Sequence, residues 1–223
     1  MLKAINIKKS YGGVPVLKGI DIEVQKGEVV TIVGASGAGK STLLQILGTL
    51  DKPDDGEVLL NGQNVSSMEG DELAKIRNLE MGFVFQFHNL LPEFTALENI
   101  CMPGMIKGLT LDELKPKALE LMEMLNISHR QDHKPAEMSG GEQQRTAVAR
   151  ALINDPSIIF ADEPSGNLDS HNADSLHKLF FQLREDLNQT FVIVTHNKEF
   201  ASMADRILEI ADGQIYQEVK KQV

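Results

Sequence analysis

The sequence predicts an α/β fold: a mostly parallel β-sheet with an antiparallel β subdomain beside it and an inserted helical lobe. Four short runs, at 29–34, 81–86, 157–163 and 191–196, are almost wholly apolar and rich in residues that favour strands. Such runs are typical of strands buried on both faces, and therefore of parallel sheets covered by helices. Elsewhere, apolar residues either recur at helical spacing or alternate with polar ones.

Alternation marks three early segments, at 2–9, 19–25 and 56–62. This pattern is typical of antiparallel strands with one face toward water. It predicts a small β subdomain beside the main sheet.

Helical spacing dominates the centre of the chain, where no convincing strand occurs between 87 and 154. We expect 1–223 to form a single domain, with the α/β core and its β subdomain in 1–86 and 158–223 and the helical lobe in 87–157. Two amphipathic stripes are expected to face the core: Leu111, Leu114, Ala118, Leu121, Met122 and Leu125, and then Leu176, Leu179, Phe180, Leu183 and Leu187.

Composition and charge narrow the class of protein. The chain has 223 residues, 42% of them hydrophobic, and a net charge of -10. The acidic balance argues against a nucleic-acid partner, since phosphate neutralisation needs a basic face. Because Cys101 is the single cysteine, an intramolecular disulfide is excluded. We therefore expect the protein to reside in a reducing cytosol. No apolar run approaches the roughly 18 residues of a membrane span, so we expect that the chain does not insert into a membrane directly. If it acts at a membrane, we expect it to do so through a partner.

Each of the four buried runs ends in a glycine or a polar residue. These are Gly34, Gln86, Asp162 with Glu163, and His196. In open α/β sheets ligands bind outside the carboxyl ends of the strands. We therefore expect these residues to converge on one active site.

A phosphate-binding loop follows the first buried run. "GASGAGKST", residues 34–42, fits the P-loop pattern between a strand and a helix. Its N–H groups would hold phosphate oxygens, Lys40 would reach the γ-phosphate, and the Ser41 hydroxyl would ligate Mg²⁺. The nucleotide-binding residues expected here are Gly34, Ala35, Ser36, Gly37, Ala38, Gly39, Lys40, Ser41 and Thr42.

Two carboxylates could supply the remaining Mg²⁺ contact and the proton acceptor. Asp162 could hold the Mg²⁺ shell through water, and Glu163 could take a proton from an attacking water, although paired acids at a strand end can also be plain turn residues. His196 could reach the γ-phosphate or be a structural histidine. A GTPase would carry Asn-Lys-x-Asp, whereas "NKEF" ends in Phe200, so ATP is the expected nucleotide.

A second glycine-rich helix start is "MSGGEQQR", residues 138–145. Ser139 and Glu142 alone would form an ordinary capping box. Gly140 and Gly141 each cost roughly 1 kcal/mol of helix stability, and bare N–H groups at a helix start bind anions. One nucleotide needs only one phosphate-binding loop, and the P-loop already supplies it. The second glycine-rich helix start therefore indicates either a second ligand or a ligand held by another molecule.

The order of the P-loop, Gln86, "MSGGEQQR", "ADEPSGNLD" and "THN" resembles the nucleotide-binding domain of ABC transporters over essentially the whole chain. The resemblance implies an ABC ATPase fold with a P-loop NTPase core. It also implies a homodimer in the ATP-bound state, in which Ser139, Gly140 and Gly141 of one subunit face the γ-phosphate held by the other.

The resemblance further implies residue roles. Tyr11 stacks on adenine, Glu163 is the catalytic base, and His196 is the γ-phosphate switch; Tyr11 as a plain loop aromatic is the alternative. Asn167 to Asp169 couple the two sites, although Ser165, Asp169 and Ser170 could be helix caps. The chain departs from the family at Met138, usually leucine, and Asn197, usually aspartate. The remaining implied ligands are Gln86, Glu142, Asp162 and Asp169 for the Mg-nucleotide, with Ser41, Gln86 and Asp162 on Mg²⁺.

The segment from Phe83 to Phe94 is rich in aromatic and leucine side chains. Its exposed part could bind a helix of the membrane partner. "QFHNLLPEFTALEN" with "DEPSGNLDS" is most similar to ATPases of lipoprotein-releasing transporters. This implies two membrane permease subunits with periplasmic domains and a peripheral place on the cytoplasmic face of the bacterial inner membrane. The alternatives are a macrolide or peptide exporter, a cell-division complex, a soluble ABC ATPase acting on nucleic acid or ribosomes, and a scaffold that does not hydrolyse ATP.

Overall fold

A computed structural model describes residues 1–220, and the chain divides into two compact units. Unit 1 comprises Met1–Arg77 and the chain from Arg184 onward; unit 2 comprises Asn78–Leu183. The predicted α/β class with a mostly parallel sheet and an antiparallel subdomain is confirmed.

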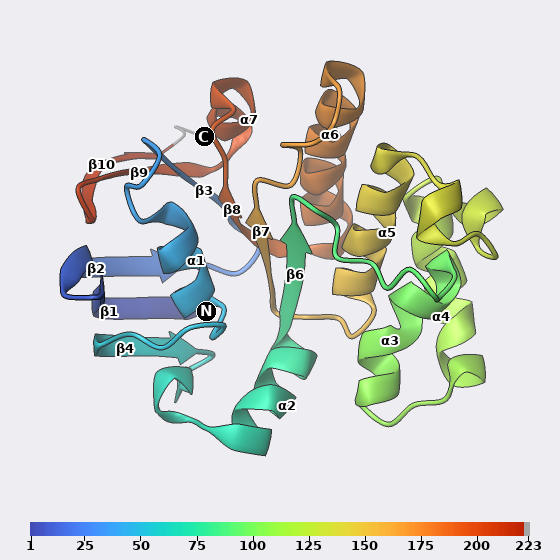
Figure 1. The fold of residues 1–223 in the computed structure, drawn as a ribbon, viewed down its shortest axis with the longest axis horizontal. Helices are drawn as coiled ribbons and strands as arrows, with labels where there is room; N and C mark the ends of the chain where they lie inside the picture. The colour runs from blue at the N-terminus through green and yellow to red at the C-terminus, as the bar shows by residue number, and fades with distance from the viewer. Residues whose placement is uncertain (221–223) are drawn as a thin grey trace. The chain divides into compact units, whose positions relative to one another are not determined.

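An antiparallel sheet forms the first layer of unit 1 (Figure 1). Its strand order is β2-β1-β4-β5, which confirms the three alternating segments. Alternate residues such as Leu2, Ile20 and Val58 are buried, as a half-buried strand requires. The strands are β1 (Leu2–Tyr11), β2 (Val14–Val24), β4 (Asp55–Leu60) and β5 (Gln63–Asn64).

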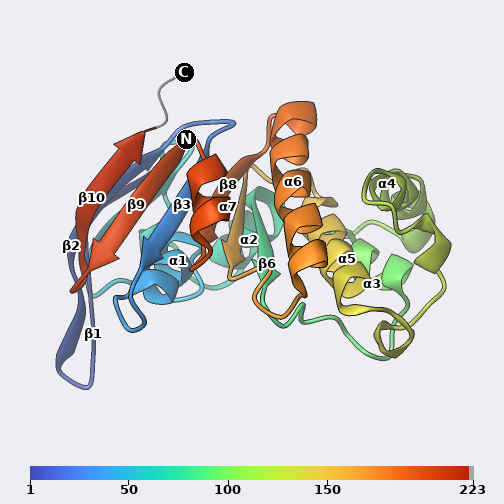
Figure 2. The same cartoon turned by 90° about the horizontal axis from the view of Figure 1, so that it is seen from above.

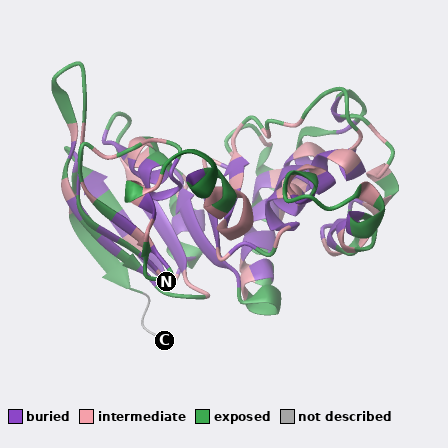
Figure 3. Ribbon diagram, turned by 90° about the horizontal axis from the view of Figure 1, so that it is seen from below, coloured by how far each residue is buried: buried purple, intermediate pink, exposed green. Residues whose placement is uncertain are grey.

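Parallel strands form the second layer of unit 1, where β3 (Val29–Gly34) lies between β8 (Thr190–Val194) and β9 (Arg206–Ala211). The strands β9, β3 and β8 lie side by side (Figure 2), and β3 and β8 carry the purple of buried residues (Figure 3). The helices of this layer are α1 (Lys40–Leu47) and α7 (Lys198–Met203). Burial on both faces explains why β3 and β8 have no polar alternation.

The sequence interpretation missed β9 and its antiparallel partner β10 (Gln214–Lys220). They are joined at Asp212 and Gly213, whose φ angles are 48° and 76°. Two successive positive φ values are those of a type I′ hairpin turn, for which Asp-Gly is a favoured pair. The signal was therefore present in the sequence.

Unit 2 contains two parallel strands and a group of helices. The strand β6 (Met81–Phe85) pairs with β7 (Ile158–Asp162). The helices α3 (Ala96–Ile106), α4 (Leu111–Met124) and α5 (Gly140–Leu152) lie together (Figure 1). Each starts with a complete capping box, made by Thr95, Thr110 and Ser139 with the glutamate three residues later.

Two helices cross from one unit to the other: α2 (Gly70–Glu80) and α6 (Ser170–Leu187). On α6 the predicted stripe is buried from Leu176 to Leu183, but Leu187 is 42% exposed, because it lies at the last residue of the helix. The expectation that Leu187 packs in the core is therefore wrong. Within residues 1–220, no helix combines the length and apolarity that a membrane crossing needs.

Candidate active site

The P-loop connects β3 to α1 in unit 1 and leaves the start of α1 without a side-chain cap. Gly39 stands at the cap position with φ of 100°, and Gly37 has φ of 79° with open space where a Cβ would be. Ala35, Ser36 and Gly37 are exposed. An uncapped helix start with positive potential fits a phosphate group.

Two glycines of this loop are required by close backbone packing. A Cβ on Gly34 would lie 2.2 Å from the Ile210 carbonyl oxygen, and one on Gly39 would lie 2.8 Å from Leu17 Cδ2. Both have positive φ, so a larger residue would be strained as well as crowded. The loop is thereby held against β9 and β2.

Lys40 folds back over the same loop. Its ammonium donates hydrogen bonds to the carbonyl oxygens of Gly34, at 3.0 Å, and Ala35, at 2.9 Å. These acceptors lie at the start of the loop, so the charge is held above the loop backbone. The arrangement of one cation with an uncapped helix fits a nucleotide polyphosphate.

Tyr11 ends β1 and is 46% exposed. Its hydroxyl donates to Asp51 Oδ2 at 2.5 Å, and the Lys9 ammonium lies 5.3 Å from the ring centroid. The Asp51 hydrogen bond is the main cause that raises the pKa of Tyr11, and Thr42 is a second hydrogen-bonding partner. Asp51 therefore orients the ring, a role that sequence reasoning missed because 40 residues separate the two.

His196 lies at the same edge as Gly34. Ile32 of β3 pairs with Val194 of β8, and Gly34 and His196 each follow two residues later. His196 is exposed, and Asn197 caps α7 by accepting a hydrogen bond from the Phe200 amide at 2.9 Å. Asparagine and aspartate cap helices equally well, so the departure at Asn197 keeps the local structure.

Gln86, Asp162 and Glu163 lie together at one edge of unit 2. The register pairs Phe85 with Asp162, so Gln86 and Glu163 follow neighbouring strand ends directly. Glu163 has φ of 47°, in the left-handed region that a glutamate rarely adopts. Such strain costs of order 1 kcal/mol or more and concentrates at functional sites.

The capping box that Ser139 and Glu142 would form is present. Ser139 Oγ accepts from the Glu142 amide at 3.3 Å, and Glu142 Oε2 accepts from the Ser139 amide at 2.8 Å. The two glycines differ: a Cβ on Gly141 would lie 2.9 Å from Asn172 Oδ1, whereas one on Gly140 would only touch Leu168 at 3.6 Å. Packing among residues 1–220 therefore explains Gly141 and leaves Gly140 unexplained.

Glu142 also contacts a guanidinium and an imidazole. Its Oε1 lies 2.7 Å from Arg130 Nε and 3.2 Å from His129 Nε2. Burial alone would raise the pKa of Glu142, but the hydrogen bonds from Arg130, Ser139 and His129 outweigh it and lower the pKa to about 2. The carboxylate is therefore ionised at neutral pH.

Glu142→Gln is expected to destabilise the protein by about 1 kcal/mol at pH 7, because it removes charge-assisted hydrogen bonds. A carboxyl whose pKa falls from 4.5 to about 2 on folding stabilises the folded state above pH 4.5 and loses that effect as pH falls toward 2. Urea denaturation of both proteins at pH 7 and pH 3 measures this. The difference should shrink at pH 3, and Glu120→Gln, at an exposed position of α4, should show none. An equal difference at both pH values would contradict the assignment.

Asp169 caps the first turn of α6. It accepts hydrogen bonds from the Asn172 amide at 2.9 Å and from Asn172 Nδ2 at 2.6 Å. These bonds hold the pKa of Asp169 below its ordinary value. Ser165 instead bonds to His177 Nε2 at 2.8 Å. The capping alternative is thus realised at Asp169.

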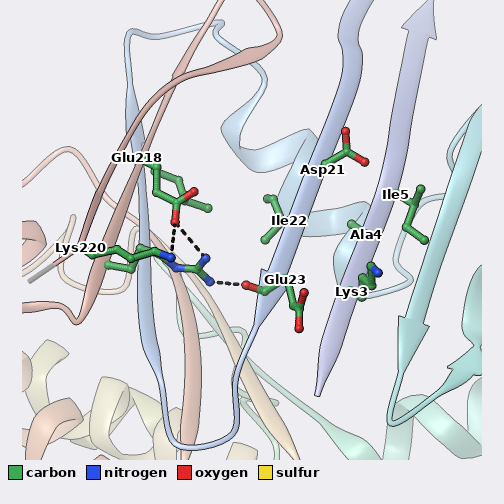
Figure 4. A pocket seen from close by; sticks show the side chains of 10 residues that line it. Lys3, Ala4, Ile5, Asp21, Ile22, Glu23, Glu218 and Lys220 are labelled. Carbon is green, nitrogen blue, oxygen red and sulfur yellow. Dashed lines mark hydrogen bonds and ion pairs between the residues drawn. The ribbon is translucent and has the colours of Figure 1, made fainter.

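A separate hollow of unit 1 lies between β1, β2 and the C-terminal hairpin (Figure 4). Three of its charged side chains, Arg206, Glu218 and Lys220, belong to one ion-pair cluster. Arg206 pairs with Glu28 at 2.9 Å and with Glu218 at 3.2 Å, and Lys220 also lies 3.4 Å from Glu218. This ion-pair cluster fastens β9 and β10 to β2, since Arg206 also bonds to the Glu23 carbonyl oxygen.

Known proteins match this chain over nearly its whole length. The family model "ABC transporter" matches residues 17–166. The lipoprotein-releasing system ATP-binding protein LolD of Cytophaga hutchinsonii is 60% identical, covering 96% of this chain and 98% of that protein. LolD of Bacteroides thetaiotaomicron is 57% identical, covering 96% and 99%. The ATP-binding cassette MJ0796, solved as a dimer bound to ADP and Pi, matches with a TM-score of 0.91 at 41% identity over 100% of both chains. The chain therefore belongs to the ABC transporter family.

Proposed function

We propose that this chain is the ATP-hydrolysing subunit of an ABC transporter that releases lipoproteins from the inner membrane. The observation that carries the ATPase part is the uncapped start of α1 beneath the folded-back Lys40. The lipoprotein part is supported by relatives named LolD that align with 96% of the chain.

In this proposal the P-loop binds the nucleotide and Glu163 is the proton acceptor. The N–H groups of residues 37–41 and the Lys40 ammonium hold the phosphates, and Tyr11 stacks on adenine. Ser41, Gln86 and Asp162 would hold Mg²⁺, which when bound neutralises charge on the β- and γ-phosphates. Glu163 accepts the proton of the attacking water, and His196 contacts the γ-phosphate.

We further propose that two copies associate around ATP. Gly140 supports this, because packing within the chain does not account for it and a partner's phosphate would. The solved relative MJ0796 is a dimer bound to ADP and Pi. Ser139 and Gly140 of one copy would contact the γ-phosphate held by the other.

The membrane partner would bind the segment after Gln86. Phe87 is 73% exposed, Leu91 41% and Phe94 38%, which is unusual for three large apolar side chains close in sequence. Arg150 fixes this segment by donating to the carbonyl oxygens of His88, at 2.7 Å, and Asn89, at 2.6 Å. A rigid apolar surface of this kind suits a partner helix from two related permeases with periplasmic domains. The chain would then lie peripherally on the cytoplasmic face of the inner membrane.

Affinity purification of the tagged protein from its own membranes in mild detergent, followed by mass spectrometry, tests this proposal. We expect two related permeases with large periplasmic domains, together with lipoproteins. Phe87→Ala should recover at least about threefold less permease, because it removes apolar surface that the permease would cover. Tyr216→Ala, at a side chain 75% exposed in unit 1, should not. A single permease with efflux or division proteins would contradict lipoprotein release, and ribosomes or nucleic acid would contradict the transporter.

A further inference from the structure

Gln86 and Asn167 form a reciprocal pair within unit 2. Gln86 Nε2 donates to Asn167 Oδ1 at 2.9 Å, and Asn167 Nδ2 donates to the Gln86 carbonyl oxygen at 3.1 Å. The residues are 81 positions apart in the chain. One asparagine side chain therefore holds both the backbone and the side chain of Gln86.

Gly166 provides the space for this pair. A Cβ on Gly166 would lie 2.9 Å from Gln86 Nε2 and 3.0 Å from its Cδ. No positive φ is involved at this glycine, so its requirement is one of room. The Gln86 side chain consequently lies directly over the backbone of the segment that follows Glu163.

The backbone around Gln86 is held by two further side chains. Gln144, fully buried on α5, donates to the Phe85 carbonyl oxygen at 3.3 Å. Arg150, on the same helix, bonds to the carbonyl oxygens of His88 and Asn89. Since the backbone of Gln86 is fixed from both sides, the Asn167 pair decides how the remaining rotatable bonds of its side chain are set.

We propose that Asn167 is a positioning residue that presets the amide of Gln86 for Mg²⁺. The Nε2 end is bonded to Asn167, so Oε1 is the end turned away from it and available to a hard cation. Presetting removes the entropy loss of ordering a long side chain at the moment the ion binds. This inference rests on the proposed function, in which Gln86 contacts Mg²⁺.

The first experiment follows the Gln86 side-chain amide by NMR in the nucleotide-free protein without Mg²⁺. Its ¹H–¹⁵N signals are assigned by their loss in Gln86→Ala. Hydrogen exchange of these signals should be about threefold to tenfold faster in Asn167→Ala, the effect of one or two net hydrogen bonds. Gly166→Ala should have the same effect by crowding Gln86. Asn172→Ala, which removes the side-chain hydrogen bond from Asn172 Nδ2 to Asp169, should leave the Gln86 signals unchanged.

The second experiment measures Mn²⁺ binding by electron paramagnetic resonance with a non-hydrolysable ATP analogue, and ATPase rate against Mg²⁺ concentration. Asn167→Ala should weaken Mn²⁺ binding and raise KM for Mg²⁺ about threefold to tenfold, with a smaller change in kcat. In the Gln86→Ala background the same substitution should add less than about twofold, because coupled residues are not additive.

Three results would overturn the inference. Unchanged Gln86 exchange in Asn167→Ala would show that the pair does not form in solution. Changed exchange with unchanged Mn²⁺ binding, or full additivity with Gln86→Ala, would show that the pair does not serve the ion. Failure of the proposed function is distinguishable, since a wild-type protein that binds no Mn²⁺–nucleotide would still give the NMR result.

Discussion

Glu163→Gln is expected to bind Mg-ATP normally, to hydrolyse it at least about 100-fold more slowly, and to become a dimer. The substitution preserves the shape of the side chain but removes the proton acceptor for the attacking water, a contribution of at least about 100-fold in rate. Without hydrolysis the ATP-bound state accumulates. Steady-state phosphate release and light scattering with Mg-ATP measure the two effects.

The controls for this variant separate chemistry from folding. Glu120→Gln, a matched change at an exposed position of α4, should keep wild-type turnover and stay monomeric with ATP. Glu163→Gln should melt within a few degrees of the wild type, because glutamine meets the same φ of 47° that glutamate does. A variant that stays monomeric at high concentration with ATP bound would contradict the proposed dimer and the role given to Gly140. Wild-type turnover by Glu163→Gln would show that Glu163 is not the proton acceptor.

Lys40→Ala is expected to weaken ATP binding about 10-fold to 100-fold. The ammonium would form charge-assisted bonds to phosphate oxygens, and an alanine leaves those charges unpaired. Titration with a fluorescent ATP analogue measures the change. Folding should be unaffected, because within residues 1–220 Lys40 donates to carbonyl oxygens of its own loop.

Lys26→Ala, a change of equal size at an exposed turn of unit 1, is the matched control and should bind ATP as the wild type does. ATP binding by Lys40→Ala within about twofold of wild type would contradict the proposed phosphate contact. Loss of binding together with a large drop in melting temperature would instead show that Lys40 holds the loop together.

Local patterns predicted much of the fold. The four buried strands and the three alternating strands appear where the sequence places them, since their hydrophobic period depends only on neighbouring residues. The hairpin of β9 and β10 was missed although its Asp-Gly turn is also local. Leu187 was misplaced because a helical stripe does not say where its helix leaves the core.

The candidate site divides in the same way. The P-loop and the capping box of Ser139 are contiguous motifs, so their chemistry could be predicted from spacing alone. Three contacts could not: Asp51 with Tyr11, Asn172 against Gly141, and Asn167 with Gln86. Each joins residues that lie at least 31 positions apart and share no pattern.

The sequence by itself therefore determined the strand runs, the loop proposed to bind phosphate, the nucleotide-hydrolysing chemistry and the family. These depend on the period of apolar residues and on short motifs whose backbone geometry is set locally. Only the tertiary structure decided which glycine of 140–141 is used for internal packing and which side chain orients Gln86. These contacts depend on the space and the hydrogen-bonding groups that segments far apart in the chain bring together. They therefore cannot be predicted from any short stretch of sequence.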